Sequence, residues 1–123
     1  MKKIQTTKAP AAVGPYSQAI ISGGLVFTSG QIAINPVTNT VEASDIVGQT
    51  EQIMKNLSAI LESAGSSMDK AIKTTCFLAN MEDFAAFNEV YGKYFTSLPA
   101  RSCAAVKTLP KNVLAEVEVI AEI

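Results

Sequence analysis

Apolar residues recur every three to four positions from residue 46 to residue 64, which is the spacing of one face of an α-helix. Ser44 precedes this run and can cap the helix, with Asp45 in its first turn. Gly65 follows the run and can end the helix as the residue beyond the C-cap. The predicted apolar stripe consists of Ile46, Val47, Thr50, Ile53, Met54, Leu57, Ile60, Leu61 and Ala64.

A second helix is predicted after residue 80. Asn80 together with Asp83 can cap its N-terminus, and aromatic residues follow at helical spacing. We interpret this stripe as core, because aromatic stripes are far more often core than part of a cofactor site. Gly92 within the helix costs up to about 1 kcal/mol relative to alanine, and no reason for it is visible in the sequence. The stripe consists of Phe84, Phe87, Tyr91, Tyr94 and Phe95.

Shorter runs rich in β-branched and aromatic residues predict six strands, two of which form a hairpin around Gly23-Gly24. Residues 31–40 are predicted to be a loop, and a turn around Pro110-Lys111-Asn112 joins the last two strands. The interleaved order predicts an α+β fold in a single domain, 1–123: a two-layer sandwich of a mixed six-stranded sheet with two helices on one face. The predicted strands cover residues 2–6, 17–22, 25–29, 71–79, 102–107 and 114–122.

Alternation along the strands indicates what each face of the sheet meets. On the last strand the odd-numbered residues from Ala115 to Ile123 are apolar and should pack on the helices. On the strand over residues 71–79, the even-numbered residues from Ile72 to Leu78 share one face. The opposite face of the last strand mixes apolar and acidic side chains. Because 48% of the chain is hydrophobic, we expect some apolar surface to be buried between subunits. If the mixed face meets other subunits, its acidic side chains need partners there.

Composition narrows the chemistry. The chain has no histidine, and no cluster of Cys, Asp or Glu has metal-ligand spacing, so we expect no metal site and no His-dependent nucleophile. The net charge is −1 and no basic face is visible, which argues against nucleic acid as a partner. No signal peptide or membrane-spanning run is recognised, so we expect a cytoplasmic protein with Cys76 and Cys103 as free thiols.

Two charged residues near the C-terminus are candidates for a reactive site. Arg101 could bind a carboxylate through two parallel hydrogen bonds, although a surface or interface salt bridge with Glu116 or Glu118 is the more common role for such a residue. Glu116 could act as a general acid or base if burial raised its pKa, and a nearby Arg101 would lower that pKa again. We place both on neighbouring extended segments.

Other candidates carry weaker signals. Cys103 shares a strand face with Arg101, and a buried structural thiol is its commoner role because no histidine can activate it. The glycines of the segments Gly14-Pro15-Tyr16 and Thr28-Ser29-Gly30-Gln31 could allow close approach of backbone to a ligand, yet neither segment is a phosphate loop. Asn88 is either a satisfied polar residue or a ligand contact.

Five segments together resemble the RidA/YjgF/UK114 family (which includes YER057c) of enamine/imine deaminases. They read GPYSQAI, LVFTSGQI, NLSAILESAG, KTTCFLANMEDFAAFNEVYGKYF and PARSCAAVKTLPKNVLAEVEVIA, and they cover nearly the whole chain in the order of the family. The last segment is the most specific. The resemblance implies a chorismate-mutase-like fold, a homotrimer with ligand clefts between subunits, and hydrolysis of 2-aminoacrylate and related imines to 2-keto acids and ammonia without cofactor.

The resemblance also implies roles for individual residues. Arg101 would bind the substrate carboxylate and Glu116 would activate or orient the attacking water. The backbone of Gly30 and Cys103 would contact the ligand, and Tyr16, Ser29 and Asn88 would line the cleft. A binding or regulatory module without turnover is an alternative, and an endoribonuclease or translation inhibitor is a third. The link from Phe95 to Pro99 is shorter than in some members, which bears on substrate range.

Overall fold

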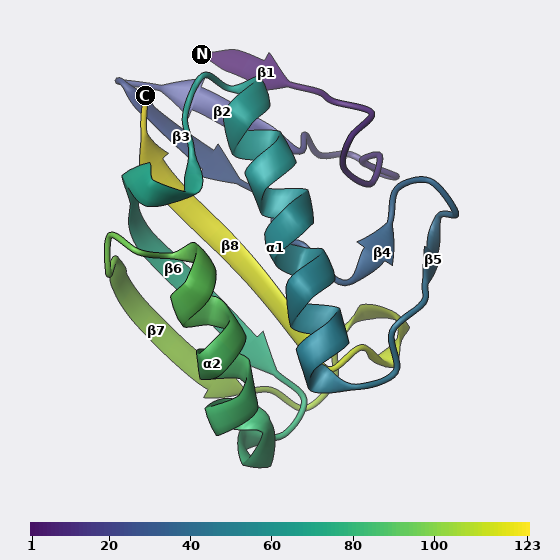
Figure 1. Cartoon of the computed structure of the whole chain (residues 1–123). Helices are drawn as coiled ribbons and strands as arrows, with labels where there is room; N and C mark the ends of the chain where they lie inside the picture. The colour runs from purple at the N-terminus through teal and green to yellow at the C-terminus, as the bar shows by residue number, and fades with distance from the viewer.

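The computed structural model describes all residues 1–123 as one six-stranded sheet with two long helices against one of its faces (Figure 1). The strand order in the sheet is β1-β2-β3-β8-β6-β7. This confirms the predicted mixed sheet with two helices in a second layer. The elements are β1 (Lys2–Ile4), β2 (Ala19–Ser22), β3 (Leu25–Thr28), β4 (Ile34–Asn35), β5 (Thr40–Val41), α1 (Ile46–Ser63), β6 (Ala71–Leu78), α2 (Phe84–Tyr94), β7 (Ala100–Ala105) and β8 (Ala115–Glu122).

The sheet topology corrects one expectation. All neighbouring strands are antiparallel except β6 and β7, which run parallel and are connected through α2. β6 lies between β7 and β8. β7, which carries Arg101, follows α2 and pairs with the outer side of β6, whereas β8, which carries Glu116, pairs with the inner side. The segments that carry Arg101 and Glu116 are therefore not neighbours. The predicted loop over residues 31–40 also contains one strand and part of another, the β4-β5 hairpin.

The ends of α1 follow capping rules, with a shift of one residue at the start. Asp45, not Ser44, is the N-cap, and its side chain accepts a hydrogen bond from the amide of Gly48 at 3.0 Å. Gly65 has φ +82°, as predicted for the residue beyond the C-cap. The amides of Gly65 and Ser66 donate to the carbonyls of Glu62 and Leu61, at 3.0 and 2.8 Å. These two bonds form a Schellman motif that ends the helix.

The start of α2 is preceded by a short 3₁₀ turn over Met81–Asp83. Asn80 caps this turn by accepting a hydrogen bond from the amide of Glu82 at 2.9 Å, whereas Asp83 makes no capping bond. The predicted aromatic stripe is partly core: Phe87, Tyr91 and Phe95 are buried between α2 and the sheet. Their rings contact one another, which fixes α2 above β6 and β7.

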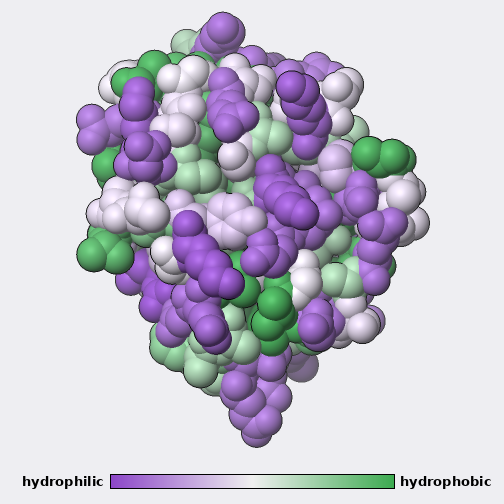
Figure 2. All heavy atoms as spheres, viewed as in Figure 1, coloured by the Kyte–Doolittle hydropathy of each residue, from purple (hydrophilic) through white to green (hydrophobic).

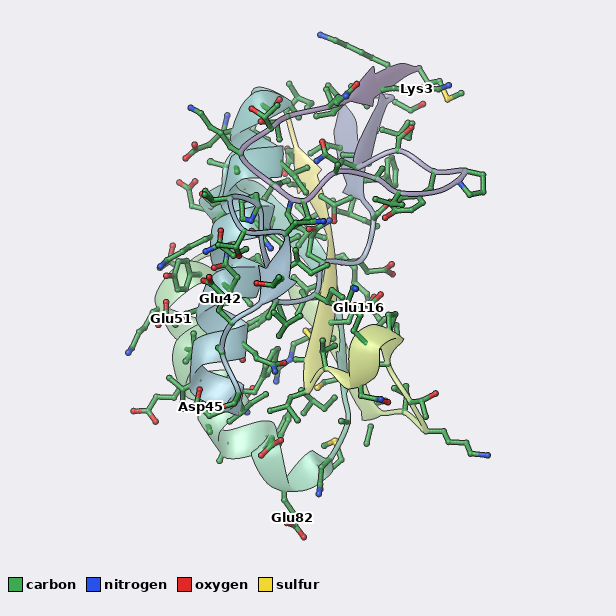
Figure 3. The ribbon with its side chains drawn as sticks, turned by 90° about the vertical axis from the view of Figure 1, so that its right-hand side faces the viewer. Lys3, Glu42, Asp45, Glu51, Glu82 and Glu116 are labelled. Atoms are coloured by element: carbon green, nitrogen blue, oxygen red, sulfur yellow. The ribbon has the colours of Figure 1, made fainter.

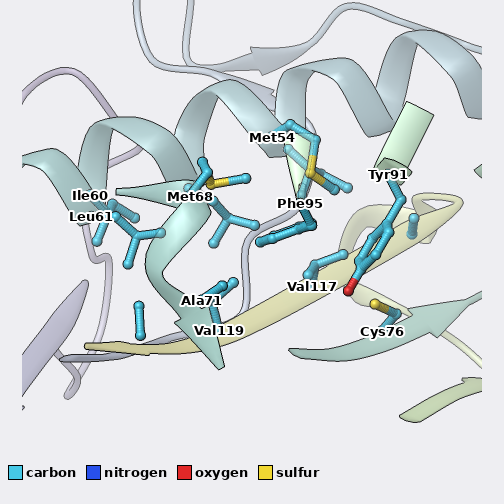
Figure 4. Close-up of a cluster of buried hydrophobic side chains, with 14 of the residues drawn as sticks. Met54, Ile60, Leu61, Met68, Ala71, Cys76, Tyr91, Phe95, Val117 and Val119 are labelled. Carbon is cyan, nitrogen blue, oxygen red and sulfur yellow. The ribbon is translucent and has the colours of Figure 1, made fainter. Parts of the chain in front are cut away.

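The core lies between the helices and the sheet (Figure 4). The odd-numbered residues of β8 from Ala115 to Ala121 are buried there, as predicted, whereas Ile123 is exposed. On β6, Thr74, Cys76 and Leu78 share one face as predicted, and this face is buried, but Ile72 is 40% exposed. A register irregularity between Ala71 and Lys73 turns Ala71 inward in its place.

The two faces of the molecule differ. The helix side presents mainly hydrophilic residues with scattered hydrophobic ones between them (Figure 2). The far face of the sheet has no helix over it. Phe27 there is 40% exposed and pairs with the half-buried Ile120, and the half-buried Phe77 lies further along the same face. Neither helix is long and apolar enough to cross a membrane.

Gly92 lies on the outer side of α2, where an added Cβ would have no heavy atom within 4 Å. Gly92→Ala is therefore expected to raise the free energy of unfolding by roughly 0.5–1 kcal/mol, because alanine loses less backbone entropy in a helix. Urea denaturation followed by circular dichroism measures this. Gly48→Ala is the matched control and should destabilise, because its Cβ would lie 2.8 Å from both Ala43 Cβ and Asp45 Oδ1. A destabilised Gly92→Ala would contradict the prediction.

Candidate functional site

Arg101 is held against α2 by three contacts. Its guanidinium carbon lies 5.4 Å from the ring centre of Phe84 and 4.8 Å from that of Tyr91. Its Nη1 donates a hydrogen bond to Asn88 Oδ1 at 2.7 Å. Phe84, Asn88 and Tyr91 follow one another at helical spacing, so a single face of α2 supplies all three. The guanidinium is thereby fixed while several of its five donors remain available to a ligand.

Arg101 faces a surface cavity of about 450 Å³ at the edge of the sheet. Asn88 and Tyr91 form one side of this cavity, and Leu98 and Pro99 form the other. The short link after Phe95 therefore borders the Arg101 cavity. Leu98 is 84% exposed and has φ +54°, so this link holds an apolar side chain out at the mouth of the cavity.

Cys103 lies two residues further along β7, on the same face as Arg101, as predicted. Burial raises the pKa of its thiol, and the charge of Arg101 partly offsets this. The amide of Val106 donates to Leu78 O of β6. Because alternate residues of a parallel strand bond toward the same neighbour, the amide of Cys103 points away from β6 to the open edge. Its backbone rather than its thiol is the group available to a ligand.

Glu116 lies on the other face of the sheet (Figure 3), where it pairs with Phe77 of β6. Its carboxylate packs directly on Gly30: a Cβ built on Gly30 would lie 2.1 Å from Glu116 Oε2. Only glycine lets the backbone come this close. The sequence singled out Gly30 for such an approach, and the structure shows that the group approached is Glu116.

A bulge between β3 and β8 creates this contact. Phe27 pairs with Ile120 and Gln31 bridges to Val117, so residues 28–30 on one side face residues 118–119 on the other. The Gln31–Val117 bridge closes the bulge with hydrogen bonds of 2.8 and 3.1 Å. Bulges redirect side chains and backbone near functional sites. Here the extra residue brings Gly30 over the carboxylate of Glu116.

Glu116 lines a cavity of about 320 Å³ together with Tyr16, Ser29 and Gly30. Ser29 is held in place because its Oγ donates to Ser17 O at 2.6 Å and its amide donates to Gln18 O at 2.9 Å. Tyr16 is 53% exposed at the rim. The structure thus brings three of the other predicted site residues together around Glu116.

Gln18 also lines this cavity, and the sequence reasoning missed it. It is 2% exposed. Its Oε1 accepts from the amide of Thr6 at 2.7 Å, and its Nε2 donates to Thr6 O at 3.0 Å and to Pro10 O at 2.8 Å. These bonds tie the irregular N-terminal segment to the cavity wall. A glutamine near the start of a strand carries no signal that separates it from a solvated residue.

The expected pairing of Arg101 with Glu116 is wrong within one chain. Arg101 pairs in register with Thr74 and thus with Val119, on the helix face, whereas Glu116 is on the open face. Burial raises the pKa of Glu116, and the negative charge of Glu118 raises it further; Arg101 makes no contribution. No group of three or more Cys, Asp or Glu side chains is placed to hold a metal ion.

Residues 6–123 match a family model described as Endoribonuclease L-PSP. A protein of Lactococcus lactis that carries a regulator name, AldR, is 56% identical over 100% of this chain and 98% of its own length. The 2-iminobutanoate/2-iminopropanoate deaminase of Escherichia coli is 45% identical over 98% of this chain and 96% of its own. The crystal structure of E. coli TdcF with bound serine superposes with a TM-score of 0.95, at 42% identity, covering 100% of this chain and 99% of that one.

The raised pKa of Glu116 predicts a pH dependence of stability. Because the folded chain binds this proton more readily than the unfolded one, Glu116 weakens folding as the pH rises from 4.5 to its folded pKa. Glu116→Gln removes that effect. Its free energy of unfolding relative to wild type should therefore rise with pH from about 4.5 and level off above the folded pKa of Glu116, as measured by urea denaturation at a series of pH values.

The matched variant is Glu118→Gln. It removes the negative charge that helps to raise the pKa of Glu116, so the pH range over which Glu116 weakens folding should become narrower. A difference between Glu116→Gln and wild type that does not change with pH would contradict the prediction.

Proposed function

The chain belongs to the RidA/YjgF family, whose model is described as Endoribonuclease L-PSP, and from that premise we propose that it hydrolyses small imino acids to 2-keto acids and ammonia. The substrates would be 2-aminoacrylate, an enamine that becomes the iminium form of 2-iminopropanoate when its CH2 carbon takes a proton, and related imines, the class to which the substrates in the name of the E. coli deaminase belong. The observation that carries the proposal is the fixed guanidinium of Arg101, which two aromatic rings and Asn88 hold at the wall of an open cavity.

Arg101 would bind the substrate carboxylate. A guanidinium can bind a carboxylate with two parallel hydrogen bonds, and its contact with Asn88 engages only one of its donors. The amide of Cys103, which points to the open edge of β7, is a second donor for the same ligand. The bound serine named for TdcF is a molecule with such a carboxylate, which supports this class of ligand.

Glu116 would act as the general base. Its pKa is raised by burial, so it holds a proton more readily than a solvated carboxylate does. Water attacks the iminium carbon as Glu116 takes one of its protons, and the electron pair of the C=N bond moves to nitrogen. Glu116 returns that proton to the nitrogen, ammonia leaves, and the hydroxyl left on the carbon gives up its proton to solvent as the carbonyl forms. An iminium carbon is already electrophilic, so acid–base help of about 10²–10⁴-fold is sufficient.

The two halves of this site require two copies of the chain. Arg101 and Glu116 lie on opposite faces of the sheet, and neither side chain can pass through it. We therefore propose that Arg101 of one copy meets Glu116 of the next. The open face, with Phe27, Phe77 and Ile120, offers apolar surface for such contacts. A cyclic homotrimer with clefts between subunits, in a chorismate-mutase-like arrangement, stays our prediction.

A regulatory module that binds a small carboxylate without turnover is the second candidate, favoured by the regulator name of AldR. It would use the same Arg101 cavity. The two candidates differ at Glu116: a binding module loses nothing in Glu116→Gln, whereas a hydrolase loses turnover and keeps affinity. Cleavage of RNA is the weakest candidate, since the net charge of −1 offers little attraction for a polyanion.

Arg101→Ala is expected to lower kcat/KM for imine hydrolysis by about 10²-fold or more, because two charge-assisted hydrogen bonds are lost. The assay follows keto acid release while a serine/threonine dehydratase generates 2-aminoacrylate from serine. Lys93→Ala is the matched control, since it removes one exposed positive charge from α2 and should leave the rate unchanged. An Arg101→Ala protein as active as wild type, or a wild type that gives no acceleration, would refute the assignment.

Mixed oligomers test whether the site is shared between copies. Arg101→Ala and Glu116→Gln should each be inactive, yet oligomers that contain both restore any site that draws Arg101 from one copy and Glu116 from the other. For random mixing into cyclic trimers, about a quarter of the wild-type activity should return. The measurement is the same coupled assay after joint refolding of equal amounts. No recovery in oligomers shown to be mixed would place both residues in one copy.

A further inference from the structure

Tyr91 of α2 makes a buried hydrogen bond to the sheet beneath it. Its hydroxyl and Thr74 Oγ1 of β6 are 2.7 Å apart, and Thr74 is 0% exposed. Figure 4 shows the ring of Tyr91 standing between α2 and β6 with its oxygen directed at the sheet, beside Cys76. The remaining contact of Thr74 Oγ1 is long, at 3.9 Å from Cys76 Sγ. The Tyr91–Thr74 pair is therefore a nearly isolated polar bond inside an apolar core.

The face of the same ring carries Arg101. The guanidinium lies 4.8 Å from the ring centre of Tyr91 and 5.4 Å from that of Phe84, and a cation is attracted to such faces. The other neighbours of Tyr91 are Phe87 and Phe95, at 5.8 and 4.6 Å between ring centres. A phenylalanine at position 91 would make the same ring contacts equally well. The hydroxyl adds one thing to this packing: it fixes how far the ring tilts and reaches over the sheet.

We infer that Tyr91 and Thr74 are positioning residues for Arg101. Thr74 fixes the ring of Tyr91, and this ring fixes the plane of the guanidinium. Asn88 then fixes the orientation of the guanidinium within that plane. Two parallel hydrogen bonds to a carboxylate demand this precision, because a guanidinium that turns freely meets both oxygens only part of the time. The inference rests on the carboxylate role proposed for Arg101. By this inference, Tyr91 of α2 and Thr74 of β6 support the carboxylate site from beneath Arg101.

The test compares Thr74→Val, Thr74→Ser, Tyr91→Phe and the double variant Thr74→Val/Tyr91→Phe. The single changes Thr74→Val and Tyr91→Phe each leave one buried hydroxyl without a partner and should destabilise the fold. The double variant removes both hydroxyls, so most of the stability should return. Thr74→Ser keeps the hydroxyl, so it should keep the hydrogen bond to Tyr91 and lose only the stability contributed by one buried methyl group.

Ligand affinity separates positioning from stability. With 2-oxobutanoate as the probe in isothermal titration, the double variant should bind about three- to tenfold more weakly than wild type, although its stability is restored. In the coupled assay KM should rise by a similar factor while kcat changes little, because Glu116 is untouched. A double variant with wild-type affinity and KM would overturn the inference and leave the proposed function standing.

A readout without ligand keeps the inference testable by itself. The ¹⁵N relaxation of the Arg101 Nε–H group in the free protein reports how rigid the guanidinium is. Its order parameter should fall in the double variant and stay at the wild-type value in Thr74→Ser. An unchanged order parameter in the double variant would overturn the positioning role. A wild-type protein with a rigid Arg101 that neither binds 2-oxobutanoate nor hydrolyses imine would instead contradict only the proposed function.

Discussion

The alternation of side chains along β-strands separates the two charged groups on which the proposed chemistry depends. Because β6 lies between β7 and β8, the register carries Arg101 to the helix face and Glu116 to the open face. The separation has an electrostatic consequence. A guanidinium beside Glu116 would lower the pKa of its carboxyl, whereas burial and Glu118 raise it here. Within one chain the sheet thus keeps the proposed carboxylate-binding cation apart from the proposed general base, so neither neutralises the other.

Buried amide side chains hold the segments around Glu116 in place. Gln18 binds the segment from Thr6 to Pro10, and Asn56 of α1 donates to the carbonyls of Ile32 and Ile34 at 3.2 and 2.9 Å. Irregular backbone near a core needs partners for its polar groups. A side-chain amide supplies a donor and an acceptor at once, so a few such residues can take the place of the backbone hydrogen bonds that a neighbouring strand would provide. The cavity wall is irregular in secondary structure and still well fixed.

Local patterns in the sequence predicted most of the fold and less of the site. Helical spacing identified α1, and Gly65 its end, because both signals involve residues close in sequence. Period-two alternation correctly put Val117 inside and Glu116 outside. The neighbours of each strand could not be predicted in this way, since only long-range packing puts β6 between β7 and β8. The bulge that places Gly30 over Glu116 is a difference in the number of residues on two strands that are distant in sequence. The sequence of either strand alone does not reveal it.

A chain without histidine has few groups that can exchange a proton near neutral pH, so the environment of Glu116 carries unusual weight. In one copy the side chain is only half-buried, with the open face of the sheet beside it. A second copy on that face would remove more water from the carboxyl, which raises its pKa, and the Arg101 that this copy brings would lower it. In the proposed assembly, the contact that delivers Arg101 to the substrate is also the contact that tunes the base. Binding and proton transfer would then appear together, and only in the assembled protein.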